Sequence, residues 1–119
     1  MVSARPFSDL RSFLDLLEIA GNLVHFGEEL SRRYEIPAAM DYIARHIGKT
    51  VVFDKVKGYD IPVAGNLYVS RKHLAIAFGV EEEQLEQTYL TRAENLLKPK
   101  MVTTGPVQDV VIKDDFNIQ

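Results

Sequence analysis

Apolar residues near the start of the chain follow the period of a helix. Four of them recur at the i, i+3, i+4, i+7 spacing that places side chains on one helix face: Leu10, Phe13, Leu14 and Leu17. Ser8 can accept a hydrogen bond from a free backbone N–H of the first turn, and Asp9 suits the positive end of the helix dipole. Gly21 and Asn22 both tolerate the left-handed conformation that ends helices. The pattern predicts a helix from about Asp9 to Ala20.

Two later segments have the same helical pattern with clear start and stop signals. Pro37 fits the first turn of one helix, where its missing N–H costs nothing, and Gly48 ends that helix. Its apolar stripe is formed by Ile36, Met40, Ile43 and Ile47. Ser70 is expected to cap a short helix that runs through Phe78 and stops at Gly79.

A last helix is predicted to open at consecutive glutamates, which suit the N-terminal end of a helix. These are Glu81, Glu82 and Glu83, and the apolar stripe after them is Leu85, Tyr89, Ala93 and Leu96. Lys98, Pro99 and Lys100 are expected to close this helix.

Three short apolar runs alternate with the helices and predict strands. The first is Leu23–Phe26, followed by a charged loop over 27–34, and the second is Val51–Phe53, which is apolar at every position and predicted to be buried. In the third, Ile61, Val63, Gly65 and Leu67 share one face by the period of two. A turn at 57–60 joins the second and third strands, which favours a hairpin. The fold class is therefore α/β (α+β), with a small mixed sheet of about three strands packed with about four helices.

Residues 102–119 have a different pattern. Loop residues at 103–106 precede a strand candidate, Val107–Lys113, whose centre at 110–112 is apolar on both faces and requires burial on both sides. Such a strand either reaches into a neighbouring chain or belongs to a following domain, and we favour the following domain. We predict an N-terminal domain over 1–101, and a linker with the first strand of the next domain over 102–119.

Composition narrows the range of functions. The chain has 119 residues, a formal net charge of −3 and no cysteine. The acidic balance argues against nucleic-acid binding, which usually needs a basic face. The lack of cysteine excludes disulfides and thiolate chemistry and suits a cytoplasmic protein. The N-terminus lacks the apolar core of a secretory signal, and no apolar run is long enough to span a bilayer.

Candidate catalytic groups are few. No two of the three histidines, His25, His46 and His73, have the i, i+4 spacing of a helical metal site, so each is interpreted as structural or exposed. His46 is placed to interact with the C-terminal end of its own helix. The acidic clusters at 28–29, 81–83 and 114–115 are interpreted as solvated or as helix starts rather than as a general-acid pair. We therefore assign no catalytic, cofactor-binding or metal-binding residue.

The segment 65–71, Gly-Asn-Leu-Tyr-Val-Ser-Arg, raises the question of a phosphate-binding loop, because it connects a strand to a helix. A dinucleotide loop needs glycines spaced G-x-G-x-x-G, and a Walker loop needs G-x-x-x-x-G-K-[ST]. Only Gly65 is present here, and Val69 stands where close backbone approach would be required. Ser70 is explained as a helix cap. A structural corner is therefore favoured over a small nucleotide-binding module at Gly65.

Three segments resemble the N-terminal region of the UbiD family of decarboxylases, which includes 3-polyprenyl-4-hydroxybenzoate carboxy-lyase. They are "DLRSFLDLLEIAGNLV" (9–24), "FDKVKGYDIPVAGNLYVSRKHLAIAFGV" (53–80) and "LLKPKMVTTGPVQDVVIKDDFNI" (96–118). The resemblance spans nearly the whole chain but only the first portion of a typical family member. It departs over 27–48, where the loop is charged and His46-Ile47-Gly48-Lys49 replaces a Gly-Gly-Pro-type turn.

The resemblance implies reversible, non-oxidative decarboxylation of aromatic or α,β-unsaturated acids, of the polyprenyl-hydroxybenzoate type used in ubiquinone biosynthesis. It implies prenylated FMN as cofactor, with Mn2+ and K+ at its phosphate. The family's flavin ligands, metal ligands and catalytic residues lie in later segments, so this chain is expected to bind no cofactor and to be inactive alone. Its expected partner is the flavin-binding domain, in cis or as another chain, and the resemblance leaves a homo-oligomer open. The alternative is a stand-alone assembly subunit that donates its C-terminal strand to a larger flavin-binding partner.

Overall fold

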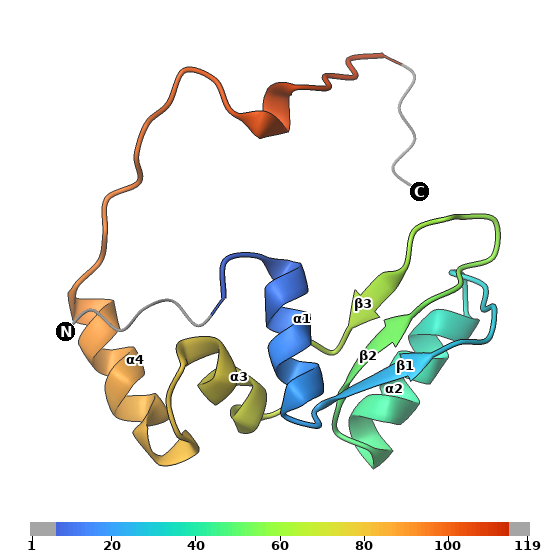
Figure 1. The fold of residues 1–119 in the computed structure, drawn as a ribbon, viewed down its shortest axis with the longest axis horizontal. Coiled ribbons are helices and arrows are strands. Elements are labelled where there is room, and N and C mark those ends of the chain that lie inside the picture. Colours follow the sequence, from blue (N-terminus) through green and yellow to red (C-terminus); the bar gives the residue numbers. More distant parts are fainter. Residues whose placement is uncertain (1–6, 115–119) are drawn as a thin grey trace.

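The computed structural model describes residues 7–114, and a three-stranded mixed sheet lies within it (Figure 1). Its strands, in spatial order, are β1 (Leu23–Phe26), β2 (Thr50–Phe53) and β3 (Val63–Gly65). β1 and β2 are parallel, whereas β2 and β3 are antiparallel, so that Val51 lies opposite both Val24 and Gly65. The predicted mixed sheet and its β2–β3 hairpin are confirmed.

The main core lies between this sheet and α2 (Glu35–His46). Ile36 and Ile43 of α2 pack with the buried side chains of Val51, Phe53 and Val56. β2 is buried along its whole length because it is the central strand, as its continuous apolar sequence predicts. Burial of each such aliphatic or aromatic side chain stabilises the fold by about 1.5–3 kcal/mol.

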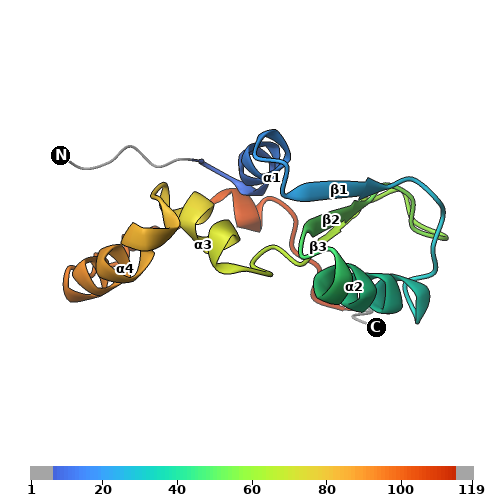
Figure 2. The same ribbon diagram turned by 90° about the horizontal axis from the view of Figure 1, so that it is seen from below.

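The helix α1 (Leu10–Ile19) lies on the opposite face of the sheet from α2, as Figure 2 shows. Phe13 and Leu17 are its buried residues. The cap is one residue later than predicted, because Asp9 rather than Ser8 is the N-cap. The Asp9 carboxylate accepts from Ser12 N at 2.9 Å, and Ser12 Oγ accepts in return from Asp9 N at 3.2 Å. This reciprocal capping box satisfies the backbone N–H groups of Asp9 and Ser12.

The remaining helices form an arm beside the sheet: α3 (Arg71–Phe78), a 3₁₀ turn η1 (Glu82–Gln84) and α4 (Leu85–Glu94) (Figure 1). Gly79 ends α3 in the left-handed conformation, as predicted. Arg92 fixes the angle between α3 and α4, since its guanidinium donates to the Phe78 carbonyl at 3.2 Å and lies over the Phe78 ring. That carbonyl belongs to the C-terminal end of α3, where a cation is favourable.

The last helix is shorter than the sequence predicts. The three glutamates lead through η1 into α4, but the helix ends at Glu94 and does not reach Lys98. Of the predicted apolar stripe only Leu85 is buried, while Tyr89 and Leu96 are exposed. Leu96 packs against no other element in the described part of the chain, so nothing stabilises a longer helix there.

The strand predicted over Val107–Lys113 is not formed. The tail, residues 95–114, contains only the 3₁₀ turn η2 (Pro106–Gln108), and its apolar side chains are exposed. A strand requires hydrogen-bonding partners along its edge, and no described strand lies beside this segment.

The third strand is also shorter than predicted, because Ile61 lies outside β3 and is exposed. None of the helices within 7–114 is long and apolar enough to cross a membrane.

Candidate functional site

The corner between β3 and α3 is filled by protein atoms. Met40 of α2 packs so closely on Gly65 that a Cβ atom at this position would lie 2.5 Å from the Met40 methyl group. Asn66 adopts a positive φ of 58°, and its Nδ2 donates to the Met40 carbonyl at 2.9 Å. The Asn66 carbonyl accepts from the buried Thr50 hydroxyl at 3.0 Å. Gly65 therefore allows close packing of α2 on the sheet, and the corner offers no cradle for a phosphate.

Ser70 stands at the N-cap position of α3, as predicted, but its hydroxyl does not cap the helix. Instead, Ser70 Oγ hydrogen-bonds His73 Nδ1 at 2.7 Å, and His73 Nε2 lies 3.3 Å from the Asn22 carbonyl. A neutral ring that donates from Nε2 and accepts at Nδ1 satisfies both contacts. Burial lowers the pKa of His73, which favours this neutral form. His73 is fully buried and ties α3 to the end of α1, so its predicted structural role is confirmed.

The other two histidines are exposed and make local contacts. His46 Nδ1 donates to the Tyr42 carbonyl at 3.0 Å, which confirms its predicted interaction with the C-terminal end of its helix. His25 lies between two carboxylates, with Nδ1 3.0 Å from Asp54 Oδ1 and Nε2 3.6 Å from Glu18 Oε1. No local pattern signals this cluster, because its members come from different elements. The parallel pairing of β1 with β2 brings Asp54 to His25, and the packing of α1 beside β1 brings Glu18.

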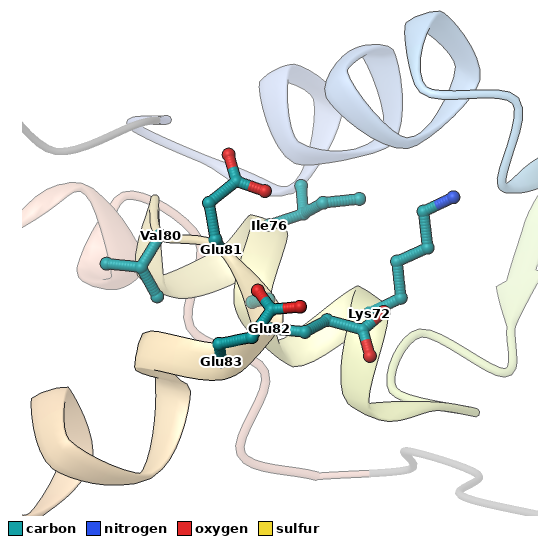
Figure 3. Close-up of a pocket in the computed structure, with 7 residues that line it drawn as sticks. Lys72, Ile76, Val80, Glu81, Glu82 and Glu83 are labelled. Atoms are coloured by element: carbon teal, nitrogen blue, oxygen red, sulfur yellow. The ribbon is translucent and has the colours of Figure 1, made fainter.

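A hollow of about 290 Å³ lies at the elbow between α3 and η1 (Figure 3). Glu81, Glu82 and Glu83 line it together with Lys72 and a few apolar side chains such as Ile76. These glutamates open the last helical segment, as predicted. Among the described residues, no group of three histidine or carboxylate side chains is arranged to hold a metal ion. The hollow is therefore an acidic surface feature, without the ligand geometry of a metal centre.

Two larger surface grooves are mainly apolar. The first, of about 440 Å³, lies between α1 and β3, and we call it the α1–β3 groove. It is formed by Leu10, Leu14, Val52, Ile61, Pro62 and Ala64, together with Asp9 and Arg11. The second, of about 450 Å³, lies between α3 and α4 and includes Leu74, Phe78, Leu85 and Tyr89.

Hydrogen bonds from Ser12 and Ser8 lower the pKa of Asp9, so that its carboxylate is a charged helix cap rather than a free acid.

The exposed surface of the chain is large for its size. A compact protein of 13.5 kDa exposes about 6,500 Å², whereas this chain exposes 10,058 Å². The two grooves and the exposed apolar side chains of the tail contribute to this difference.

Comparisons with known proteins agree with this description. Residues 14–92 match the family model of the 3-octaprenyl-4-hydroxybenzoate carboxy-lyase N-terminal domain, UbiD_N. An uncharacterized protein of Aquifex aeolicus is 34% identical over 136 residues, which cover 95% of this chain and 28% of that protein.

Solved structures show the same relationship. The closed form of vanillic acid decarboxylase from Sedimentibacter hydroxybenzoicus superposes with a TM-score of 0.76 and 30% identity, over 97% of this chain and 26% of that chain. An evolved dimeric form of the UbiD-class enzyme HmfF from Pelotomaculum thermopropionicum, in complex with prFMN, gives a TM-score of 0.68 and 28% identity, over 77% and 21%. The chain thus spans about a quarter of the length of these relatives. With the family model covering most of its helices and all three strands, this chain belongs to the UbiD N-terminal domain family.

Proposed function

We propose that this chain is the N-terminal scaffold domain of a cytoplasmic, prenylated-FMN-dependent decarboxylase that acts on aromatic or α,β-unsaturated carboxylic acids. The match of nearly the whole chain to a quarter of a solved decarboxylase carries this proposal. The domain boundary near residue 101 stays a prediction, with residues 102–119 leading into the flavin-binding domain. As part of the same proposal, the substrate is an acid such as the polyprenyl-hydroxybenzoate type, and Mn2+ and K+ accompany the flavin in the full-length enzyme.

Neither the glycine corner nor the acidic hollow fits the flavin or its metal ions. The glycine corner is occupied by Met40, Asn66 and Thr50, which leave no cradle for a phosphate. The acidic residues at 81–83 do not form a metal site with their neighbours. We therefore derive no chemical step on this chain, and the absence of catalytic residues before Gln119 stays a prediction. The modified flavin, when bound elsewhere in the enzyme, supplies the electron sink for decarboxylation.

The exposed tail also fits the alternative of a stand-alone assembly subunit. In that case residues 107–113 would form a strand only on a larger flavin-binding partner, because the tail lacks a strand neighbour of its own. The reading frame after Gln119 separates the two candidates. An open frame that encodes a flavin-binding domain supports the scaffold domain, whereas a stop codon and co-purification with a larger subunit support the alternative.

The test compares the 119-residue chain with the longer polypeptide after incubation with prenylated FMN. Flavin retained after desalting is measured by absorbance, and decarboxylation of vanillate and related acids is measured by product chromatography. We expect flavin and activity with the longer polypeptide and neither with the chain alone. Stoichiometric flavin retention by the chain alone would contradict the scaffold role.

A further inference from the structure

The helical arm of α3, η1 and α4 carries the second of the two apolar grooves, which we call the α3–α4 groove. One wall belongs to α3, where Arg71, Leu74 and Phe78 recur at the spacing of a single helix face. The other wall belongs to α4 and includes Leu85 and Tyr89. Both walls are therefore part of the arm rather than of the sheet.

The apolar side chains of α4 are mostly in contact with solvent. Within α4 only Leu85 is buried, whereas Tyr89 is 59% exposed. Leu90 is 51% exposed and lies one turn after Glu86, on the same side of the helix. Because a short helix is stabilised mainly by the packing of its apolar face, a second surface against α4 would supply burial that the domain itself does not.

The arm is also accessible to another molecule. It extends away from the sheet, and α4 is its outer helix in both views (Figures 1 and 2). The inner helix, α3, joins it to the body of the domain through the buried His73. A second protein can thus approach α4 without meeting the sheet or α2.

The two charged residues of the groove indicate which partner fits it. Arg71 stands on the α3 wall and Glu86 on the α4 wall, and neither forms an ion pair with another described residue. A small anion would meet Glu86 and a small cation would meet Arg71, so the groove suits neither.

A two-fold axis changes this balance of charges. Such an axis places the same patch against itself, so a contact between two different residues occurs twice. A patch with one cation and one anion on opposite walls is then complementary to itself. A second copy of the chain carries the required charges at the required positions by symmetry, whereas another protein would need them independently.

We propose that the α3–α4 groove is a homodimer interface, in which the arms of two copies pack groove to groove across a two-fold axis. Tyr89 and Leu90 of each copy are buried against the apolar walls of the other, and Arg71 of each copy lies opposite Glu86 of the other. Two helix pairs packed in this way form a small four-helix arrangement. The proposal goes beyond the proposed function and holds whether or not the full-length protein is a decarboxylase.

Charge reversal tests this arrangement in the 119-residue chain. The variants are Arg71→Glu and Glu86→Arg, and the control is Arg33→Glu, which alters the net charge like Arg71→Glu but lies in the loop before α2. All three side chains are exposed, so the fold is retained, and equal urea midpoints verify this. Sedimentation velocity over a concentration series measures the dissociation constant of the dimer for each variant and for an equimolar mixture of Arg71→Glu with Glu86→Arg.

The parent and Arg33→Glu are expected to dimerise with equal dissociation constants. Each reversal in the groove should weaken the dimer by about tenfold or more, because symmetry replaces two attractive pairs by two repulsive ones. The mixture should regain the affinity of the parent, since in the mixed dimer both pairs are again of opposite charge. Pairing of Arg71 with Glu86 inside one chain would give no such recovery.

Three results would overturn the proposal. The first is a parent chain that stays monomeric up to about 1 mM, which is weaker than a specific dimer requires. The second is a dimer whose dissociation constant is unchanged by either reversal, as expected if the exposed tail caused the association. The third is a mixture that associates no better than the single variants. None of these results depends on flavin or on decarboxylation, so the proposed function is tested separately.

Discussion

Replacement of Asn66 by alanine should destabilise the domain more than the loss of one small side chain suggests. The side chain donates from Nδ2 to the Met40 carbonyl at 2.9 Å, and a partly buried hydrogen bond of this kind contributes about 1 kcal/mol. Its backbone has a φ of 58°, which costs an alanine roughly 1–2 kcal/mol and an asparagine less. The two effects together predict a loss of about 2 kcal/mol in the free energy of unfolding.

Asn66→Gly is the matched control, because glycine accepts the positive φ but lacks the amide donor. We expect this variant to lose about 1 kcal/mol, half of the loss in Asn66→Ala. In a domain of this size, 2 kcal/mol lowers Tm by roughly 8–16 °C. Urea and thermal unfolding followed by far-UV circular dichroism measure both variants, with m-values checked for constancy. Equal losses in the two variants would refute the contribution of φ, and two variants as stable as the parent chain would refute the role of Asn66 in the corner.

Three further predictions concern the packing around the same corner and the helical arm. Burial lowers the pKa of His73 in the folded state, so the unfolded chain takes up its proton first as the pH falls. Stability should be constant above the unfolded value of 6.5, fall as the pH decreases from 6.5 to the lower folded pKa, and level off below it. Urea midpoints that do not change below pH 6.5 in the parent relative to His73→Gln would contradict this. Gly65→Ala should lower the free energy of unfolding by about 1–3 kcal/mol, because the added Cβ meets Met40. In a double-mutant cycle, Met40→Ala should remove most of this penalty, and additive losses would show that the contact is not the cause. Arg92→Ala should destabilise the helical arm by about 1 kcal/mol, because the Phe78 carbonyl loses its donor. Hydrogen exchange should accelerate in α4 and stay unchanged in β2, whereas uniform acceleration would argue against a local effect of Arg92.

Local sequence signals located most of the elements correctly. The helix stops at Gly21, Gly48 and Gly79 all have positive φ in the structure, as expected for residues that end helices. The continuous apolar run of β2 predicted its burial, and the hairpin followed from the short connection at 57–60. These features depend on the conformational preferences of a few neighbouring residues, which a sequence displays directly.

Predictions failed where a segment depends on a partner elsewhere in the chain. The length of α4 was overestimated because the stripe at Tyr89 and Leu96 finds little to pack against beyond Leu85. The apolar run at 107–113 has the composition of a strand, but its edges have no described neighbour. The serine at position 70 had the right place for a cap, yet its hydroxyl bonds the ring of His73 instead.

The sequence by itself determined the family and the nature of the β3–α3 corner. Its motif spacing lacks the glycines of a phosphate loop, and three ordered segments resemble UbiD decarboxylases. Only the tertiary structure decided why Gly65 is glycine, since its close neighbour Met40 lies 25 positions away in the sequence. It also decided which apolar surfaces remain open, because burial depends on contacts between distant segments and not on local pattern. The α1–β3 groove and the exposed tail follow from that arrangement alone.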